Sequence, residues 1–192
     1  KIDTDGKERF PVINTILLRI LGIYEPETSS VLFNEINKGD VILEIGAAYG
    51  YFTAQMSKLV GNSGHVISIE PATYMNSACD ETISLNNLNN VHLIKKALIP
   101  KKKKIDFLNA YDTTHLEQII KSYKLKFINF IFIDIDASSR TGVELRQEED
   151  LLKSILPILD KLGWYPKIFL EYVEQGKCFE NIYKLLLKFG YE

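Results

Sequence analysis

Residues 41–53 read VILEIGAAYGYFT, and this stretch decides the fold class. Val41–Ile45 is an apolar run interrupted by one acid, a loop of small residues follows at Gly46–Gly50, and a helical segment begins at Tyr51. An apolar run that is rich in Val and Ile and is followed by glycine is typical of a strand buried in a parallel sheet. The stretch therefore predicts a strand, a tight loop and a helix, in that order.

The same alternation of apolar strands and helical segments continues along the chain. Further strands are predicted at His65–Ile69, Val91–Lys95, Phe127–Ile133 and Ile168–Tyr172, and helices near Tyr51–Leu59, Tyr74–Asn86, Asp112–Lys121, Glu148–Leu162 and Cys178–Phe189. Strands that alternate with helices form βαβ units, in which the strands are parallel and helices cover both faces. We therefore expect an α/β fold with a Rossmann-like, doubly wound and mostly parallel sheet.

The composition is that of a globular protein with no general attraction to polyanions. The 192 residues are 46% apolar and carry a formal net charge of -2, so nucleic acid is a less favoured partner, with Lys101–Lys104 as its local candidate. Two cysteines are typical of a reducing compartment and predict a cytoplasmic protein. Arg19 interrupts the apolar run Val12–Ile23, so no membrane span is expected. We divide the chain into an N-terminal helical cap or entry segment, residues 1–38, and one globular unit, residues 39–192.

The loop after the first predicted strand has the residues of a ligand cradle. In an open parallel sheet, ligands bind beyond the carboxyl ends of the strands, near the point where the strand order reverses. Gly46 and Gly50 have no side chain, and Ala47 and Ala48 add little bulk, so the backbone can approach a flat ligand closely. Tyr49 is the loop aromatic that we expect to contact this ligand. The alternative interpretation is a plain tight turn.

The spacing of the loop disfavours a dinucleotide as the ligand. The dinucleotide motif G-x-G-x-x-G requires a glycine where Ala48 stands. The observed spacing is acid-x-Gly-x-x-x-Gly, in which Glu44 could meet a cationic amino group such as that of S-adenosylmethionine. Glu70 follows the second predicted strand, where a carboxylate can accept hydrogen bonds from both ribose hydroxyls. We therefore predict S-adenosylmethionine as the cofactor and Glu70 as its ribose ligand, although Glu70 can also be interpreted as a helix-start acid.

These residues resemble those of class I S-adenosylmethionine-dependent methyltransferases, and within them of the FkbM-like family. The resemblance rests on Tyr24–Glu27, Gly39–Ala47, Gly50–Thr53, Val66–Pro71, Asn86–Val91 and Lys96–Leu98. It implies an enzyme that methylates a hydroxyl of a small molecule, a sugar or a glycan. The glycine loop alone also resembles isoaspartyl and tRNA adenosine methyltransferases, so an RNA or protein methyltransferase is the alternative. The complete predicted cofactor site is Glu44, Gly46, Ala47, Ala48, Tyr49, Gly50, Glu70, Pro71, Ala97 and Asp134.

Acids after the fourth predicted strand are the candidates for catalysis. A hydroxyl acceptor is helped by a general base, and Asp134 and Asp136 leave the strand where the methyl group should point. We expect Asp136 to help remove the proton. Two acids two residues apart face the same side of a strand and could instead share a divalent cation, although we assign no metal.

This segment also departs from the FkbM-like pattern. The family reads Asp-x-Glu-Gly-x-Glu after this strand, whereas here Asp134-Ile135-Asp136-Ala137 stands, with Glu144 further along. Either Asp136 or Glu144 can therefore correspond to the active-site acid. The altered pattern leaves open a non-catalytic module that binds S-adenosylmethionine without turnover. The closing antiparallel hairpin of the family is expected to be missing from this chain, and the sequence does not indicate an oligomeric state.

Overall fold

The structure is a computed structural model that describes residues 24–100, 111–135, 147–171 and 178–192. Contacts divide the chain into two compact units, residues 1–35 and 36–192. The described part of the first unit contains helix α2 (Pro26–Glu35), which begins with a proline and carries Glu27 in its first turn. Both residues are favourable at a helix N-terminus. The domain boundary after residue 38 stays a prediction, and the second unit is described by itself below.

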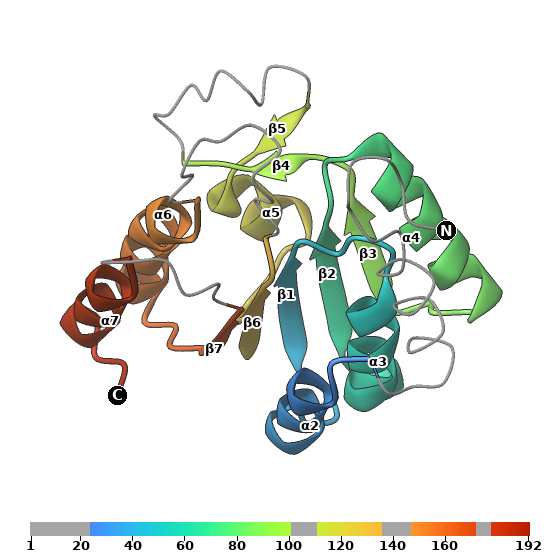
Figure 1. The fold of residues 1–192 in the computed structure, drawn as a ribbon, viewed down its shortest axis with the longest axis horizontal. Helices are drawn as coiled ribbons and strands as arrows, with labels where there is room; N and C mark the ends of the chain where they lie inside the picture. The colour runs from blue at the N-terminus through green and yellow to red at the C-terminus, as the bar shows by residue number, and fades with distance from the viewer. Residues whose placement is uncertain (1–23, 101–110, 136–146, 172–177) are drawn as a thin grey trace, which may run out of the picture. The chain divides into compact units, whose positions relative to one another are not determined.

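The second unit is built on a five-stranded parallel sheet (Figure 1). Its strands are β1 (Val41–Ile45), β2 (His65–Ile69), β3 (Val91–Ile94), β6 (Phe130–Ile133) and β7 (Lys167–Leu170), in the order β3-β2-β1-β6-β7. All four neighbouring pairs are parallel. The chain adds strands on one side of β1 and then, from β6 on, on the other side. This reversal between β1 and β6 confirms the predicted Rossmann-like, doubly wound α/β fold.

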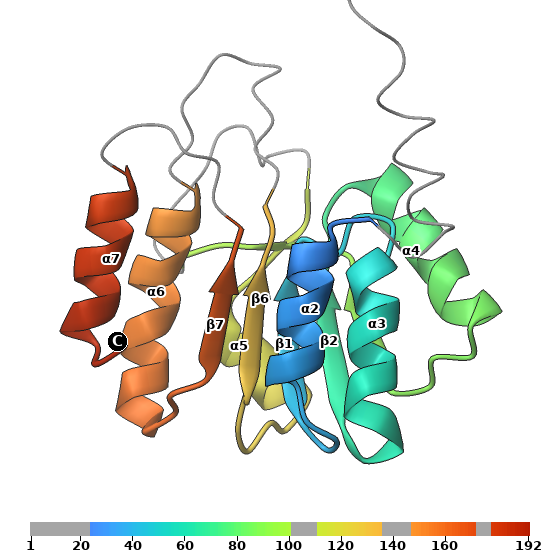
Figure 2. The same ribbon diagram turned by 60° about the horizontal axis from the view of Figure 1, so that its bottom comes forward.

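Helices cover both faces of this sheet (Figure 2). They are α3 (Tyr51–Val60), α4 (Thr73–Leu85), α5 (Leu116–Ser122), α6 (Gln147–Leu162) and α7 (Cys178–Lys188). Successive side chains of a strand point to opposite faces. Leu43 and Ile45 of β1 therefore join the core cluster that includes α5, α6 and α7. Glu44, between them, meets Thr53 of α3 on the other face.

The bounds of β1 and β2 agree with the predicted strands, because these two strands lie inside the sheet. Ile42, Leu43, Val66, Ile67 and Ile69 are at most 1% exposed. Each such side chain contributes about 2 kcal/mol relative to an exposed one. A strand buried on both faces needs a continuous apolar run, and this run is the pattern that the sequence displays.

A short second sheet replaces part of a segment predicted as a helix. β4 (Ala97–Leu98) and β5 (Thr113–Thr114) pair in parallel, so the helix predicted at Asp112–Lys121 begins only at Leu116. The amide of Ala97 donates to the carbonyl of Asp112 at 2.7 Å, and the amide of Ile99 donates to the carbonyl of Thr114 at 3.0 Å. Threonine is branched at Cβ and is favourable in strands.

The fourth strand of the main sheet is shorter than predicted. β6 begins at Phe130 rather than at Phe127, because its pairing with β1 begins at Ile42. Asn129 occupies the preceding position, where its side-chain oxygen accepts a hydrogen bond from the backbone N–H of Val41 at 2.9 Å. The bounds of β3 and β7 differ from the predicted ones by one or two residues.

Candidate functional site

The predicted glycine loop lies at the carboxyl edge of the sheet, between β1 and α3. The amides of Gly46 and Ala47 both donate to the carbonyl of Ile69 at 3.0 Å, which ties the loop to the end of β2. Gly46, Ala48 and Gly50 have φ angles of 96°, 45° and 83°. These positive angles are easy for glycine and uncommon for alanine. The loop is therefore a tight turn held by its own protein neighbours.

Packing within the protein excludes a side chain at Gly46 and leaves little room for one at Gly50. A Cβ at Gly46 would lie 1.8 Å from the backbone oxygen of Asp134, which follows β6. A Cβ at Gly50 would lie 3.0 Å from Sγ of Cys79 on α4. Neighbouring protein atoms therefore give both glycines a reason that the sequence did not display. The contact of these glycines with a ligand stays a prediction.

Glu70 reaches from the end of β2 to the glycine loop. Its Oε2 accepts a hydrogen bond from the backbone N–H of Ala48 at 2.9 Å, and its Oε1 accepts one from the backbone N–H of Ala72 at 2.8 Å. The side chain is 5% exposed, and burial raises the pKa of the carboxyl while the two amide hydrogen bonds oppose that rise. Each carboxylate oxygen has two lone pairs. Each oxygen of the carboxylate can therefore accept a second hydrogen bond. That a ribose hydroxyl donates it stays a prediction.

Glu44 lies beneath the loop, between the sheet and α3. Its Oε2 accepts hydrogen bonds from Oγ1 of Thr53 at 2.7 Å and from Oγ of Ser68 at 2.5 Å. The side chain is 1% exposed, and burial raises the pKa of its carboxyl to about 7. Its hydrogen bonds join β1, β2 and α3. Glu44 is thus an internal support of the loop, and its direct contact with a ligand stays a prediction.

The aromatic residue of the loop has a partner that sequence reasoning missed. Tyr49 is half-buried, and its ring meets the ring of Tyr74 edge to face, with centroids 6.0 Å apart. Tyr74 belongs to the first turn of α4 and is exposed. The only signal in the sequence is an aromatic residue shortly after Glu70-Pro71. Ala97, the last predicted cofactor residue before β6, is buried in β4.

Asp134 lies at the point where the strand order reverses. It follows β6 directly, is half-buried, and its amide donates to the carbonyl of Ile45 at 3.0 Å. It is therefore adjacent to Gly46, as expected for a residue at the ligand edge. The predicted acids Asp136 and Glu144 and the run Lys101–Lys104 lie outside the described residues. Within the described ranges, no group of three or more His, Cys, Asp and Glu side chains could hold a metal ion.

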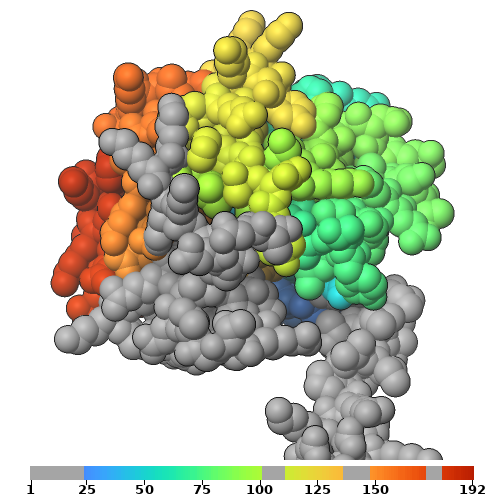
Figure 3. Space-filling model, turned by 90° about the horizontal axis from the view of Figure 1, so that it is seen from above, coloured from blue at the N-terminus to red at the C-terminus, as the bar shows by residue number. Residues whose placement is uncertain are grey.

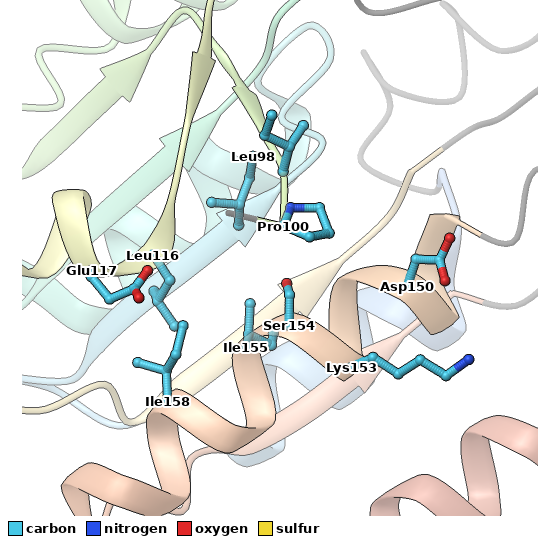
Figure 4. A pocket seen from close by; sticks show the side chains of 10 residues that line it. Leu98, Pro100, Leu116, Glu117, Asp150, Lys153, Ser154, Ile155 and Ile158 are labelled. Carbon is cyan, nitrogen blue, oxygen red and sulfur yellow. The ribbon is translucent and has the colours of Figure 1, made fainter. Parts of the chain in front are cut away.

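A cavity of about 450 Å³ lies between the end of β4, α5 and α6 (Figure 4). Figure 3 shows the molecule from above, where the β5–α5 segment in yellow lies beside α6 in orange. The lining is mostly apolar, with four polar or charged residues, and consists of Leu98, Ile99, Pro100, Leu116, Glu117, Asp150, Lys153, Ser154, Ile155 and Ile158. The predicted cofactor residues do not line this cavity, so it is not the site that the sequence indicates.

Part of the chain matches a methyltransferase family. The family model described as protein-L-isoaspartate(D-aspartate) O-methyltransferase matches residues 26–97. A protein-L-isoaspartate O-methyltransferase of Fervidobacterium nodosum is 40% identical over 60 residues, and one of Ignicoccus hospitalis is 37% identical over 60 residues. These matches cover 31% of this chain. The chain spans only 30% and 28%, respectively, of the length of these two relatives.

The likeness to solved structures extends over most of the chain. The precorrin-6y C5,15-methyltransferase of Geobacter metallireducens has a TM-score of 0.57 at 16% identity, covering 86% of this chain and 71% of that one. This chain has the fold of a class I S-adenosylmethionine-dependent methyltransferase. Aeropyrum pernix fibrillarin, a structure with natively bound S-adenosyl-L-methionine, has a TM-score of 0.54 at 13% identity, covering 87% of this chain and 65% of that one.

The matched segment of this methyltransferase fold contains the whole predicted cofactor loop. Residues 26–97 include the acids Glu44 and Glu70 and the loop between β1 and α3, and they end at Ala97. Strands β6 and β7 and the acids that follow them lie beyond the match. In the described parts of the chain, no helix is long and apolar enough to cross a membrane.

Proposed function

We propose that this chain is an S-adenosylmethionine-dependent methyltransferase. The observation that carries the proposal is Glu70, a carboxylate at the end of β2 that is hydrogen-bonded to the glycine loop within the family match. The names of the matching relatives and the cofactor bound to fibrillarin support it. In this proposal Glu70 accepts hydrogen bonds from the ribose hydroxyls, and the cofactor lies over the loop at Ala47–Tyr49. Pro71 and Ala97 border it.

When bound, this cofactor supplies a methyl group that its sulfonium charge activates for transfer. The residues of the chain then have to orient the acceptor and keep water out. Gly46 and Gly50 give the loop its shape, and Glu44 supports the loop from below. We propose that Asp134 contacts the cofactor from the end of β6, beside Gly46.

For the acceptor, we propose the free α-carboxylate of an isoaspartyl residue in a protein. The matching family and both relatives are named after isoaspartate in proteins. These names favour protein methylation over methylation of a small molecule. A carboxylate is already ionised near neutral pH, so its oxygen can attack a methyl group without a general base. This proposal extends beyond the matched residues, because the match ends before β6.

A hydroxyl of a small molecule, a sugar or a glycan is the second candidate acceptor. The FkbM-like features at Asn86–Val91 and Ala97 favour it. A hydroxyl requires removal of a proton, and this is the role that we propose for Asp136, with Glu144 as the alternative acid. An RNA acceptor is less favoured because the net charge is -2. The cytoplasmic location stays a prediction.

The acceptor is tested with S-adenosylmethionine that carries a labelled methyl group. A peptide with one isoaspartyl residue is compared with the same peptide carrying aspartate, and with a panel of hydroxyl acceptors. A methyl ester formed on the carboxylate releases labelled methanol in mild base, whereas a methyl ether on a hydroxyl is stable. Transfer to the isoaspartyl peptide alone supports the first candidate. Cofactor binding without any transfer favours the non-catalytic module, and absence of both overturns the proposed function.

A further inference from the structure

Two of the three histidines of the chain lie together at the edge of the sheet that is opposite to the glycine loop. His65 is the first residue of β2, and His92 is the second residue of β3 (Figure 1). The two strands are adjacent and parallel, so their first residues lie at one edge of the sheet. Glu70 follows the last residue of β2 and is hydrogen-bonded to the glycine loop at the other edge. The histidines are therefore separate from the proposed cofactor site.

The two imidazole rings lie on the same face of the sheet. His92 is in register with Ile67 of β2, and side chains two residues apart on a strand share one face, so His65 and His92 are diagonal neighbours. Their ring centroids are 5.7 Å apart, and the ring planes are inclined by 33°. Both side chains are exposed, so an ion can reach the pair from solvent.

The ring of His92 has a second aromatic neighbour that holds it in place. Tyr123 directly follows α5, and its ring centroid lies 5.3 Å from that of His92. The tyrosine is itself partly buried against the hydrophobic core. Burial lowers the pKa of His92, and the nearby His65 lowers it further. His92 is therefore neutral near pH 7, and the neutral imidazole is the form that binds metal ions.

We propose that His65 and His92 together bind one divalent transition-metal ion, and that this ion joins β2 to β3. Imidazole nitrogens suit Zn²⁺, Ni²⁺ and Cu²⁺, whereas Mg²⁺ prefers oxygen ligands. A Zn–N bond is about 2.0 to 2.1 Å long, so the ion lies roughly 3 Å from each ring centroid, and one ion fits between two rings 5.7 Å apart. The described residues form no group of three His, Cys, Asp or Glu ligands, so water completes the coordination.

The site is tested by titration calorimetry of the whole chain, without a histidine tag, with Zn²⁺. We expect wild type to bind Zn²⁺, and His65→Ala and His92→Ala each to weaken this binding by at least about tenfold, since even partners behind a metal ligand contribute 10- to 100-fold. His115→Ala is the matched control, because His115 precedes α5, at the opposite end of that helix from Tyr123. It should bind Zn²⁺ as wild type does. Mg²⁺ should give no binding that depends on the two histidines.

Thermal melting provides a second measurement on the same variants. An ion that binds only the folded chain stabilises it, so Zn²⁺ should raise the melting temperature of wild type and of His115→Ala. It should leave the melting temperature of the variant that lacks both His65 and His92 unchanged, and a chelator should reverse the rise in the other two. Circular dichroism verifies that each variant keeps its fold.

Three results would overturn the inference. The first is absence of Zn²⁺ binding by wild type, which would mean that the two rings only pack against each other. The second is equal Zn²⁺ affinity in wild type and in both variants, which would place the ion elsewhere. The third is a loss of affinity in only one of the two variants. Binding of S-adenosylhomocysteine by the same variants should equal that of wild type, so the inference and the proposed function fail independently.

Discussion

Acids stand at or near the strand ends in both halves of the sheet, but only one half lies within the family match. In the half from β1 to β3, the carboxylates of Glu44 and Glu70 accept hydrogen bonds from neighbouring strands, helices and the loop. In the half from β6 to β7, Asp134 and Glu171 follow the strands, and their amides donate to the carbonyls of Ile45 and Ile133. The first half is also the one that the family model matches, since the match ends at residue 97.

This difference separates what a fold must share from what it can vary. A cofactor common to many enzymes requires a fixed loop and a fixed acid, and hydrogen bonds to the backbone provide both. The acceptor differs between enzymes of one fold, so the residues that contact it vary in sequence. We therefore propose that the first half provides most of the cofactor contacts, joined by Asp134 at the end of β6, and that the second half provides the contacts with the acceptor.

The largest effect is expected in the second half, at Asp136. With a hydroxyl acceptor, Asp136→Asn should lower turnover by roughly 10² to 10⁴, the usual contribution of a general base. With an isoaspartyl carboxylate, the same change should leave turnover close to wild type, because no proton has to be removed. Steady-state kinetics with each acceptor measures this. A change in cofactor affinity that equals the change in turnover would contradict the division between the two halves.

Gly46 joins the two halves, and its substitution should affect the fold itself. Gly46→Val should lower the free energy of unfolding by roughly 3 to 5 kcal/mol, because the new side chain meets the backbone of Asp134 at a positive φ. Urea denaturation measures the change. Gly163→Val is the matched control, since Gly163 has a φ of 69° but no atom within 4 Å of an added Cβ. Equal losses of unfolding free energy in the two variants would show that backbone strain at positive φ, and not the contact with Asp134, causes the destabilisation.

Glu44 should make the stability of the first half depend on pH. Burial raises the pKa of its carboxyl from 4.5 to about 7 in the folded protein, so the native state retains a proton that the unfolded chain has lost. Stability from this group is therefore present at low pH and is lost as pH rises from about 4.5 to 7. Glu44→Gln should gain about 2 to 3 kcal/mol relative to wild type between pH 5 and 8.

Chemical denaturation at several pH values measures that gain. Glu81→Gln, an exposed acid on α4, is the control and should show no such difference from wild type. A Glu44→Gln variant whose stability follows the wild-type pH profile would mean that Glu44 is ionised in the folded protein.

The smallest effect is expected for cofactor affinity at Glu70. Glu70→Ala should weaken binding of S-adenosylhomocysteine by about 1 to 3 kcal/mol, the range for loss of a charged hydrogen-bond partner. Glu171→Ala is the matched control, because Glu171 is an exposed acid that follows a strand of the other half. Titration calorimetry of both variants compares the halves directly. Similar affinities for the two variants would remove Glu70 from the cofactor site.

The sequence predicts the parts of the molecule that local patterns decide. Val41–Ile45 and His65–Ile69 have the predicted bounds, since burial on both faces requires an uninterrupted apolar run. The place of Glu70 at the edge of the glycine loop follows from its position directly after a strand. These features involve residues that are neighbours in the chain or that occupy equivalent strand ends.

Other features depend on contacts between distant residues, which the sequence does not display. The pairing of Ala97 with Thr113 converts a predicted helical turn into strand β5. The requirement for Gly46 comes from Asp134, and the partner of Tyr49 is a tyrosine on another helix. Periodicity and turn signals describe one segment at a time, so these contacts require the assembled fold.

The central claim is that the first half binds S-adenosylmethionine at the loop and at Glu70. Titration of the wild-type chain with S-adenosylhomocysteine and, separately, with nicotinamide adenine dinucleotide tests it most directly. We expect saturable binding of one S-adenosylhomocysteine per chain and no binding of the dinucleotide, because Ala48 stands where a dinucleotide site needs glycine. Binding of the dinucleotide, or no binding of S-adenosylhomocysteine, would contradict the claim.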